Sequence, residues 1–275
     1  IQSRANRPGL LRFARNDEGL CGQHELMPPP RILAIAGSDS SGGAGIQADI
    51  KTITMLGGYA MTAITAITAQ NTLGVTAVEV LSPELIAAQI DACASDIGVD
   101  AVKIGMLGSP AIAAVVADRI AALGVPIVFD PVMVATSGAA LADSATIAGF
   151  ERLMRLATLT TPNVAELAAL GGHEAMAARG VAYLAKGGDG TSERVEDVLC
   201  LPGAAPHVMA GTRIHTRHTH GTGCTLSSAI ATYLGRGLEL PEAIDRARLF
   251  VRSALRAAPG FGAGSGPLGH TEARG

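Results

Sequence analysis

Short apolar segments alternate with helix-like segments along most of this chain, and this alternation limits the fold more than any other feature. The apolar segments expected to form strands are 32–36, 59–67, 75–81, 99–104, 126–129, 159–161 and 181–185. Helical patterns are expected at 46–56, 82–95, 110–123, 145–156, two short stretches around 171–172, the stretch from 223 to 234, and 241–257. Such alternation predicts an α/β domain with a mostly parallel central sheet and helices on both faces. A pair of antiparallel strands is expected at 195–199 and 207–214.

The composition agrees with such a sheet and excludes several classes of function. Hydrophobic residues make up 48% of the chain and aromatic residues 3%, so the core must consist mainly of Ala, Val, Ile and Leu, as buried parallel strands require. No apolar run is as long as a membrane span, which needs about 18 residues. A net charge of −3 gives no excess of positive charge for binding nucleic acid. The four cysteines lack metal-type spacing and indicate reduced thiols in a cytoplasmic protein.

We expect one domain over residues 31–262 with an extension at each end. Residues 1–30 carry four arginines but no periodic apolar face, and they end in three prolines. We expect this segment to be disordered, with Met27 as the natural start; its acidic residues disfavour a targeting peptide. Residues 263–275 are rich in glycine and are expected to form a flexible tail.

Polar, acidic or glycine-rich residues directly follow six of the predicted strands. They are the loop 37–45, Gln70, Met106, Asp130, Asn163 and Lys186. In open α/β sheets, ligands bind outside the carboxyl ends of the parallel strands. The six positions therefore predict a ligand site along one edge of the sheet.

A glycine-containing turn, Gly221–Thr222–Gly223, leads directly into a long helical pattern. The first N–H groups of a helix have no partner within the helix, and together with the helix dipole they favour a bound anion such as phosphate. Cys224 lies at this helix start, where the pKa of a thiol falls from about 8.5 toward neutral. We therefore expect an anion site with an accessible thiolate that accepts the proton of a reacting hydroxyl. The alternative is a turn that only caps a core helix.

Three further positions have side chains suited to a ligand. The amide of Gln70 offers a donor and an acceptor, which suits the edge of a nitrogen heterocycle that carries an amino group. Asp130 and Glu166 are candidates for Mg²⁺, which usually takes one or two carboxylates together with water and phosphate oxygens. The alternatives are a loop-anchoring role for Gln70 and an ordinary helix start for Asn163 and Glu166.

Other familiar sites fit the sequence poorly. The loop 37–45 lacks the Gly-Lys-Ser/Thr ending of a P-loop and the glycine spacing of a dinucleotide fingerprint. His215, His218 and His220 have no nearby cysteine or carboxylate to complete a zinc site. Of 21 basic residues only three are lysines, and all three fall in the motif-like stretches, which suggests a need for compact ammonium groups. They are Lys51, Lys103 and Lys186.

Several of these stretches together resemble one family, the hydroxymethylpyrimidine/phosphomethylpyrimidine kinases of thiamine synthesis, within the ribokinase-like superfamily. The matching strings are AIAGSDSSGGAGIQADIKT (34–52), TAITAQNTLGV (65–75), VDAVKIGML (99–107), DPVMV (130–134), TPNVAE (161–166), KGG (186–188) and THGTGCT (219–225). The resemblance extends from about Arg31 to Phe261. It implies a three-layer ribokinase-like fold and a homodimer.

The resemblance also implies an activity and a set of site residues. The activity is ATP- and Mg²⁺-dependent phosphorylation of 4-amino-5-hydroxymethyl-2-methylpyrimidine and then of its monophosphate. Around the pyrimidine it implies Gln70, Gly37, Asp49, Met106 and Val132. For the nucleotide it implies Asn163, Lys186 and Thr219, and for the metal Asp130 and Glu166. It makes Gly221, Thr222 and Gly223 the anion hole and puts Cys224 at the position of the catalytic base.

Three departures from the family pattern keep alternatives open. Thr136 stands where the family usually has Lys, and His218 replaces the usual Asn. Residues 172–181 are shorter than in the family, so we expect a truncated helix before Lys186. The alternatives are a pyridoxal kinase, which typically has Asp at the position of Cys224, and a catalytically impaired pyrimidine-binding relative.

Overall fold

The computed structural model describes residues 28–135, 138, 141–188 and 190–273. The expectation of disorder for the N-terminal extension therefore falls, up to residue 27, outside the described residues, as does Thr136. Among the helices of the described chain, none is both long and apolar enough to cross a membrane.

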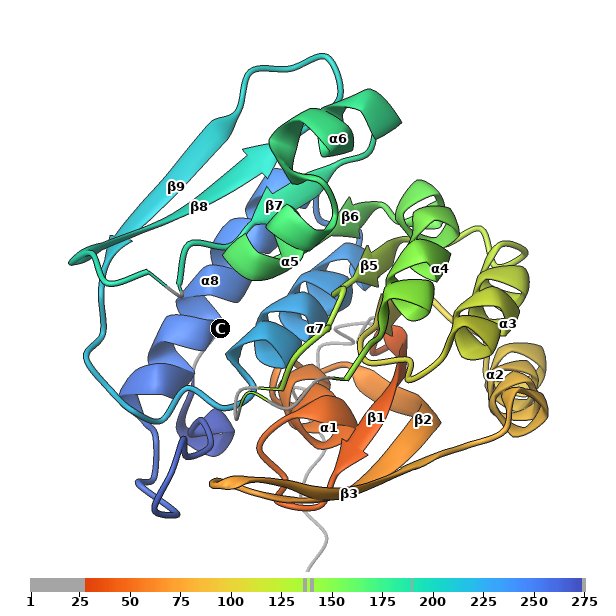
Figure 1. Ribbon diagram of the computed structural model, residues 1–275, viewed down its shortest axis with the longest axis horizontal. Coiled ribbons are helices and arrows are strands. Elements are labelled where there is room, and N and C mark those ends of the chain that lie inside the picture. The colour runs from red at the N-terminus through yellow and green to blue at the C-terminus, as the bar shows by residue number, and fades with distance from the viewer. Residues whose placement is uncertain (1–27, 136–137, 139–140, 189, 274–275) are drawn as a thin grey trace, which may run out of the picture.

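The described residues contain one nine-stranded sheet in the order β3-β2-β1-β4-β5-β6-β7-β8-β9 (Figure 1). The strands are β1 (Arg31–Asp39), β2 (Tyr59–Asn71), β3 (Gly74–Val80), β4 (Ala101–Ile104), β5 (Ile127–Phe129), β6 (Leu159–Thr160), β7 (Tyr183–Ala185), β8 (Arg194–Cys200) and β9 (His207–Thr212). The strands from β2 to β7 run parallel, and β3, β8 and β9 pair antiparallel at the two edges. The predicted mostly parallel sheet and the antiparallel pair are confirmed.

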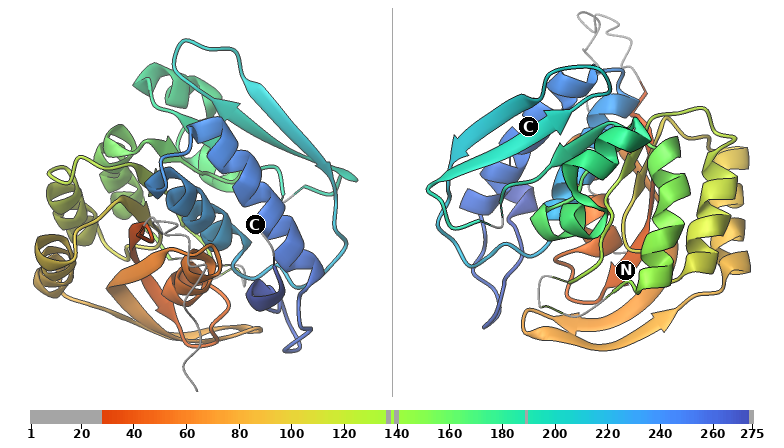
Figure 2. Two further views of the ribbon diagram at one scale, coloured as in Figure 1. Left: turned by 180° about the vertical axis from the view of Figure 1, so that it is seen from behind. Right: turned by 45° about the horizontal axis from the view of Figure 1, so that its top comes forward.

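Helices cover both faces of this sheet, as predicted (Figures 1 and 2). They are α1 (Gly45–Met55), α2 (Pro83–Asp96), α3 (Pro110–Ile120), α4 (Ser144–Leu156), α5 (Val164–Ala169), α6 (Gly172–Arg179), α7 (Thr222–Gly235) and α8 (Leu240–Arg256). On one face, α1, α7 and α8 bury residues such as Ile53, Ile230 and Phe250. On the other face, α2 to α6 bury residues such as Ile112 and Phe150.

The expected short helix before Lys186 is present as α6. It follows Gly171 and begins at Gly172, whose φ angles of 94° and 76° favour glycine, and it has eight residues. Met176 is its one fully buried residue, and a hollow of about 380 Å³ lies beside it, lined by residues of α4 and α5 and by Arg179. The hollow therefore lies between α4, the end of α5 and the end of α6.

The glycine-rich segment after Phe261 is not a flexible tail, so that expectation is wrong for residues 263–273. Leu268, His270 and Ala273 are buried, and the Gly269 N–H donates to the Ala254 carbonyl. A Cβ on Gly264 would lie 2.0 Å from the Thr72 carbonyl oxygen. The glycines therefore serve close approach of two backbones, a second reason for glycine that composition does not distinguish from flexibility.

His270 connects this segment to α7 and makes stability depend on pH. Burial, helped by the positive charge of Lys51, lowers the pKa of His270 from 6.5 to about 4. Since the unfolded chain binds the proton more tightly, stability should be complete above pH 6.5 and fall as the pH drops toward 4, by up to about 3 kcal/mol.

Urea unfolding across this pH range checks the expectation. His270→Gln keeps a polar partner for the Thr225 hydroxyl, which lies 2.9 Å from His270 Nε2. In this variant the free energy of unfolding should fall much less between pH 6.5 and pH 4 than in the wild type. His207→Gln, at an exposed position, is the control and should leave the slope unchanged. If the free energy of unfolding fell equally toward pH 4 in the wild type and in His270→Gln, His270 would not be the cause of the loss of stability at acid pH.

Candidate active site

The β1–α1 loop is built around the carboxylate of Asp39. The carboxylate accepts hydrogen bonds from the Ser41 N–H and hydroxyl and from the N–H groups of Gly43 and Ala44, at 2.8 to 3.1 Å. It also lies 2.8 Å from His220 Nε2. Burial alone would raise the pKa of Asp39, but the hydrogen bonds from His220, Ser41 and Ala44 outweigh it and lower the pKa. Asp39 therefore holds this loop as an ionised carboxylate.

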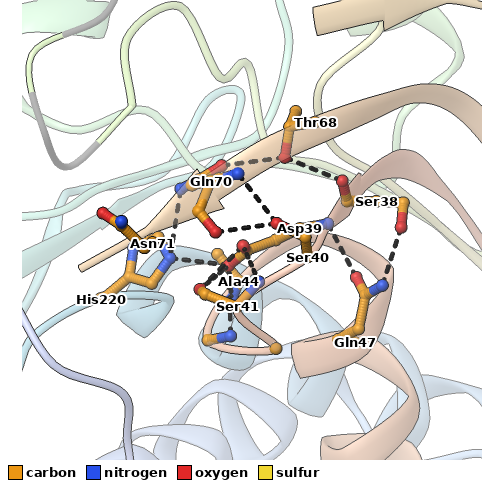
Figure 3. A network of polar contacts seen from close by, with 12 residues as sticks. Ser38, Asp39, Ser40, Ser41, Ala44, Gln47, Thr68, Gln70, Asn71 and His220 are labelled. Carbon is orange, nitrogen blue, oxygen red and sulfur yellow. Dashed lines mark hydrogen bonds and ion pairs between the residues drawn. The ribbon is translucent and has the colours of Figure 1, made fainter. Parts of the chain in front are cut away.

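Gln70 lies at the end of β2, directly above that loop (Figure 3). Its amide is 3.3 Å from His220 Nε2 and 3.2 Å from the Thr68 hydroxyl, and its backbone N–H donates to the Ser40 hydroxyl at 2.8 Å. The loop-anchoring alternative is thus realised by the backbone of Gln70. The side-chain amide is partly buried among polar groups, as a ligand-orienting residue requires.

Two more of the predicted pyrimidine residues lie together beside this loop. A Cβ on Gly37 would be 2.9 Å from the Met106 sulfur, so the bare backbone of Gly37 allows Met106 to pack against β1. The Thr65 hydroxyl donates to the Met106 carbonyl at 2.7 Å. Val132 is partly buried two residues after Asp130, whose carbonyl accepts its N–H.

The predicted anion turn lies against the same loop. Gly221 has φ of 87°, and a Cβ there would be 1.9 Å from the Gly43 carbonyl oxygen, so this position accepts no other residue. Thr222 begins α7, and its N–H and hydroxyl both donate to the Thr219 carbonyl. A Cβ on Gly223 would be 3.3 Å from Asp130 Oδ2 and 3.4 Å from Lys186 Nζ. The start of α7 therefore lies between the pyrimidine-side residues and the predicted nucleotide-side residues.

The nucleotide-side residues form a network around Lys186. Lys186 Nζ donates to Asp130 Oδ1 at 2.8 Å and lies 3.8 Å from Glu166 Oε2. Burial would lower the pKa of Lys186, but the carboxylates of Asp130 and Glu166 outweigh it and raise the pKa, so the ammonium stays charged. Asn163 and Glu166 form a reciprocal capping box at the start of α5, which is the helix-start alternative. This cap fixes Glu166 beside Lys186.

The donor set fits Mg²⁺ only as part of a larger shell. Among the described residues, no group of three or more His, Cys, Asp or Glu side chains could hold a metal ion. Asp130 and Glu166 are two carboxylates that share one ammonium, which matches the protein share of a Mg²⁺ shell completed by phosphate and water oxygens.

The pKa of Cys224 differs from the expectation. Burial raises the pKa of this thiol to about 11, and the nearby Lys103 ammonium, which lowers it, does not compensate. The carboxylates of Asp49 and Asp130 raise it further. The expected accessible thiolate at neutral pH is therefore wrong for this site, because position at a helix start does not outweigh burial beside two carboxylates.

Asp49 lies beneath the site rather than on its surface. Its carboxylate accepts from Lys103 Nζ at 2.8 and 2.9 Å and from the Ser228 hydroxyl at 2.7 Å, and both ion-pair side chains are fully buried. Burial would lower the pKa of Lys103, but Asp49 and its neighbours outweigh it and raise the pKa, so the ammonium stays charged. Burial raises the pKa of Asp49 itself, and the hydrogen bonds from Lys103 and Ser228 oppose that rise. The resemblance assigns Asp49 to the pyrimidine; its contacts within the described chain are structural.

The sequence reasoning missed two residues that hold the Lys186 turn. Asp197 on β8 accepts from the Gly187 N–H at 3.0 Å and from Arg248 Nε of α8 at 2.8 Å. A Cβ on Gly187 would be 2.1 Å from the Glu196 carbonyl oxygen, so the turn is pressed against β8. The alternation of β8 marks Asp197 as inward-facing, and an acid at such a position was the available signal.

Replacing Asp197 by Asn should move the Lys186 turn and leave Arg248 facing an amide nitrogen. If Lys186 binds nucleotide phosphates, we expect kcat/KM for ATP to fall about tenfold, since a hydrogen bond to a charged group contributes about 1.5–3 kcal/mol. The Kd of the pyrimidine, measured by calorimetry, should stay unchanged. Glu196→Gln is the control at the exposed neighbouring position and should have no effect. An equal fall of kcat/KM for ATP in Asp197→Asn and Glu196→Gln would show that Asp197 does not hold the Lys186 turn.

His218, which replaces the family's usual Asn, packs against the C-terminal segment. The Nδ1 atom of His218 is buried without a partner among the described residues, and a Cβ on Gly266 would be 2.2 Å from it. The next histidine, His220, donates its backbone N–H to the Gly266 carbonyl at 3.1 Å. His220 was set aside with the zinc hypothesis, yet the structure brings it into the site.

Comparisons with known proteins agree with the resemblance. A model of the phosphomethylpyrimidine kinase family matches residues 39–269. A hydroxymethylpyrimidine/phosphomethylpyrimidine kinase of Rhizobium meliloti (strain 1021) is 48% identical over 255 residues, which cover 86% of this chain and 96% of the relative.

Two solved structures share the ribokinase-like fold of this chain. An ADP complex of Bacillus subtilis pyridoxal kinase superposes with a TM-score of 0.81 at 34% identity, covering 89% of this chain and 98% of that one. Phosphomethylpyrimidine kinase of Clostridium difficile 630 superposes with a TM-score of 0.69 at 38% identity, covering 82% and 99%. The chain belongs to the phosphomethylpyrimidine kinase family.

Proposed function

We propose that this chain transfers the γ-phosphate of ATP to the hydroxymethyl group of 4-amino-5-hydroxymethyl-2-methylpyrimidine, and then phosphorylates the monophosphate. The observation that supports this most is the position of the α7 start. On one side of its glycine turn, Gly221 lies against the Gly43 carbonyl of the β1–α1 loop; on the other, a Cβ on Gly223 would be 3.3 Å from Asp130 Oδ2 and 3.4 Å from Lys186 Nζ. A phosphate at that turn would meet a hydroxyl from one side and a nucleotide from the other.

The proposed roles follow from charge and position. The backbone of Gly221 and Gly223 binds the transferred phosphate, at a turn that Thr222 holds through its N–H and hydroxyl bonds to the Thr219 carbonyl. Lys186 neutralises nucleotide phosphates, assisted by Asn163 and Thr219. Asp130 and Glu166 would hold Mg²⁺, which supplies charge neutralisation when bound with ATP. The pyrimidine is oriented by Gln70, Gly37, Met106 and Val132. Asp49 supports the site from beneath. Phosphoryl transfer needs such positioning and charge stabilisation more than covalent chemistry.

Cys224 is the proposed acceptor of the hydroxyl proton, and its raised pKa makes this testable. Because the thiolate is the minor form at neutral pH, kcat should rise with pH from about 7 to about 9. Cys224→Ala should lower kcat about 100-fold and lose that pH dependence, with Kd for ATP unchanged. A flat pH profile in the wild type, or nearly full turnover of Cys224→Ala, would confine Cys224 to a role in shape.

ADP release measured with three acceptors tests the proposed function. We expect turnover with the hydroxymethylpyrimidine and with its monophosphate, and lower kcat/KM with pyridoxal. Pyridoxal is included because a pyridoxal kinase superposes well on this chain. Preferred turnover of pyridoxal would favour a pyridoxal kinase, and binding of the pyrimidine without ADP release would favour an impaired relative. A homodimer is proposed on the resemblance alone, and a cytoplasmic location on the cysteines, which indicate reduced thiols.

A further inference from the structure

His220, Asp39 and Gln70 form a buried polar contact on the pyrimidine side of the site (Figure 3). His220 is 4% exposed and Asp39 3%. His220 Nε2 lies 2.8 Å from Asp39 Oδ2 and 3.3 Å from the amide nitrogen of Gln70. Which of these atoms carries a proton follows from the partners of each.

The proton on His220 is determined by Asp39. The Asp39 carboxylate already accepts from the Ser41 hydroxyl and from the N–H groups of Ser41, Gly43 and Ala44. An ionised carboxylate can only accept. His220 Nε2 must therefore carry a proton and donate it to Asp39, so an N–H that faces this nitrogen meets another donor.

The Thr68 hydroxyl gives a second and independent constraint. It has one proton and lies 3.0 Å from the Ser38 carbonyl oxygen and 3.2 Å from the amide oxygen of Gln70. A backbone carbonyl only accepts, so the shorter contact takes the proton. The hydroxyl then presents a lone pair to Gln70, and an amide oxygen there meets another acceptor.

Exchanging the oxygen and nitrogen of the Gln70 amide removes both unfavourable contacts, the donor–donor contact at His220 and the acceptor–acceptor contact at Thr68. Amide oxygen and nitrogen have nearly the same shape and are assigned from their hydrogen-bond partners. We propose that Gln70 Oε1 shares the His220 Nε2–H with Asp39 in a three-centre hydrogen bond, that Gln70 Nε2 donates to the Thr68 hydroxyl, and that the His220–Asp39 pair locks this orientation. His220 is thereby a positioning residue that determines specificity.

The consequence for the ligand rests on the proposed function. A Gln70 amide in one fixed orientation presents its donor and its acceptor in a fixed order. The edge of an aminopyrimidine, a ring nitrogen next to an amino group, can therefore bind to it in one orientation. In the proposed substrate the hydroxymethyl group is next to the amino group, so this order also decides which way the hydroxyl points. The 4-oxo analogue has the reverse pattern, a ring N–H beside a carbonyl, and turning it over moves its hydroxyl away.

Discrimination between the amino and the 4-oxo substrates tests the lock. We expect the wild type to prefer the amino substrate in kcat/KM by at least about 100-fold. His220→Leu removes the N–H and leaves Asp39 its other four donors, and it should reduce this preference by at least about tenfold because the amide can turn. His220→Gln keeps an N–H donor and should retain most of the preference. An equal loss on both substrates in His220→Leu, with the preference unchanged, would overturn the proposal.

Nuclear magnetic resonance of the ligand-free wild type gives a readout that needs no turnover. With ¹⁵N-labelled histidine, the His220 Nε2 signal, identified by its loss in His220→Gln, should be that of a protonated nitrogen. The Gln70 amide protons should show Overhauser contacts to Thr68 and not to the His220 ring. An unprotonated Nε2, or the reverse contacts, would overturn the proposal even in an active enzyme. An inactive protein that shows the expected spectra would instead refute the proposed function and leave the lock intact.

Discussion

Replacing Lys103 by methionine is expected to lower the free energy of unfolding by about 3–5 kcal/mol, because it leaves the Asp49 charge buried without its counterion. Lys103 and Asp49 are both fully buried, and Ser228 would be the one remaining side-chain donor to Asp49 among the contacts described above. Domains have a total stability of about 5–15 kcal/mol, so the variant should unfold at much lower urea.

Two further variants separate the pair from general damage at the site. Lys103→Met with Asp49→Leu removes both charges and should recover most of the lost stability. Arg152→Met breaks the exposed pair with Asp118, whose side chains are 53% and 55% exposed, and should cost less than about 1 kcal/mol. If Lys103→Met unfolds at the wild-type urea concentration, the buried pair does not have the charge state described.

Replacing Lys186 by methionine is expected to lower kcat/KM for ATP about 100- to 1000-fold, as the loss of one charge-stabilising donor does in other transferase and hydrolase sites. The substitution removes the ammonium that lies 2.8 Å from Asp130 and 3.8 Å from Glu166. Two carboxylates would then face the incoming phosphates without compensation, so binding and transfer should both suffer.

Steady-state kinetics with both substrates measure this effect. Lys51→Met removes an exposed lysine of α1, whose Nζ donates to the Gly42 carbonyl at 2.7 Å, and should lose far less activity. Urea unfolding of both variants shows whether they are folded. A Lys186→Met enzyme that keeps kcat/KM for ATP within a small factor of wild type would remove Lys186 from the nucleotide site.

These two lysines show how far the sequence could be interpreted. Their rarity among basic residues singled out all three lysines of the chain. Lys103 does form a fully buried ion pair and Lys186 a largely buried one, whereas Lys51 is exposed. The strand-end pattern likewise placed Asp130, Asn163 and Lys186 at one edge, because parallel strands align their carboxyl ends. The pattern could not say that Lys103 pairs with Asp49 on α1, since that contact depends on how α1 packs against the sheet.

The errors have a common physical origin. A thiol at a helix start was expected to ionise, but its pKa depends on burial and on carboxylates from distant parts of the chain, Asp49 and Asp130. The glycine-rich segment was expected to be flexible, but its glycines allow close contact with Thr72, the residue that follows β2. His220 and Asp197 were missed because their partners lie 181 and 51 residues away in the chain. Local sequence patterns thus predict helices and strands, whereas pKa values and contacts in the site depend on residues that are distant in the sequence.

The most direct test of the central claim follows phosphorus through the reaction. The enzyme, ATP, Mg²⁺ and the hydroxymethylpyrimidine are mixed and observed by ³¹P nuclear magnetic resonance. The account predicts a pyrimidine monophosphate signal that appears with ADP and is then replaced by a diphosphate signal, and neither signal with Lys186→Met on the same time scale. ATP that stays intact with a folded wild-type enzyme, or equal product formation by Lys186→Met, would contradict it.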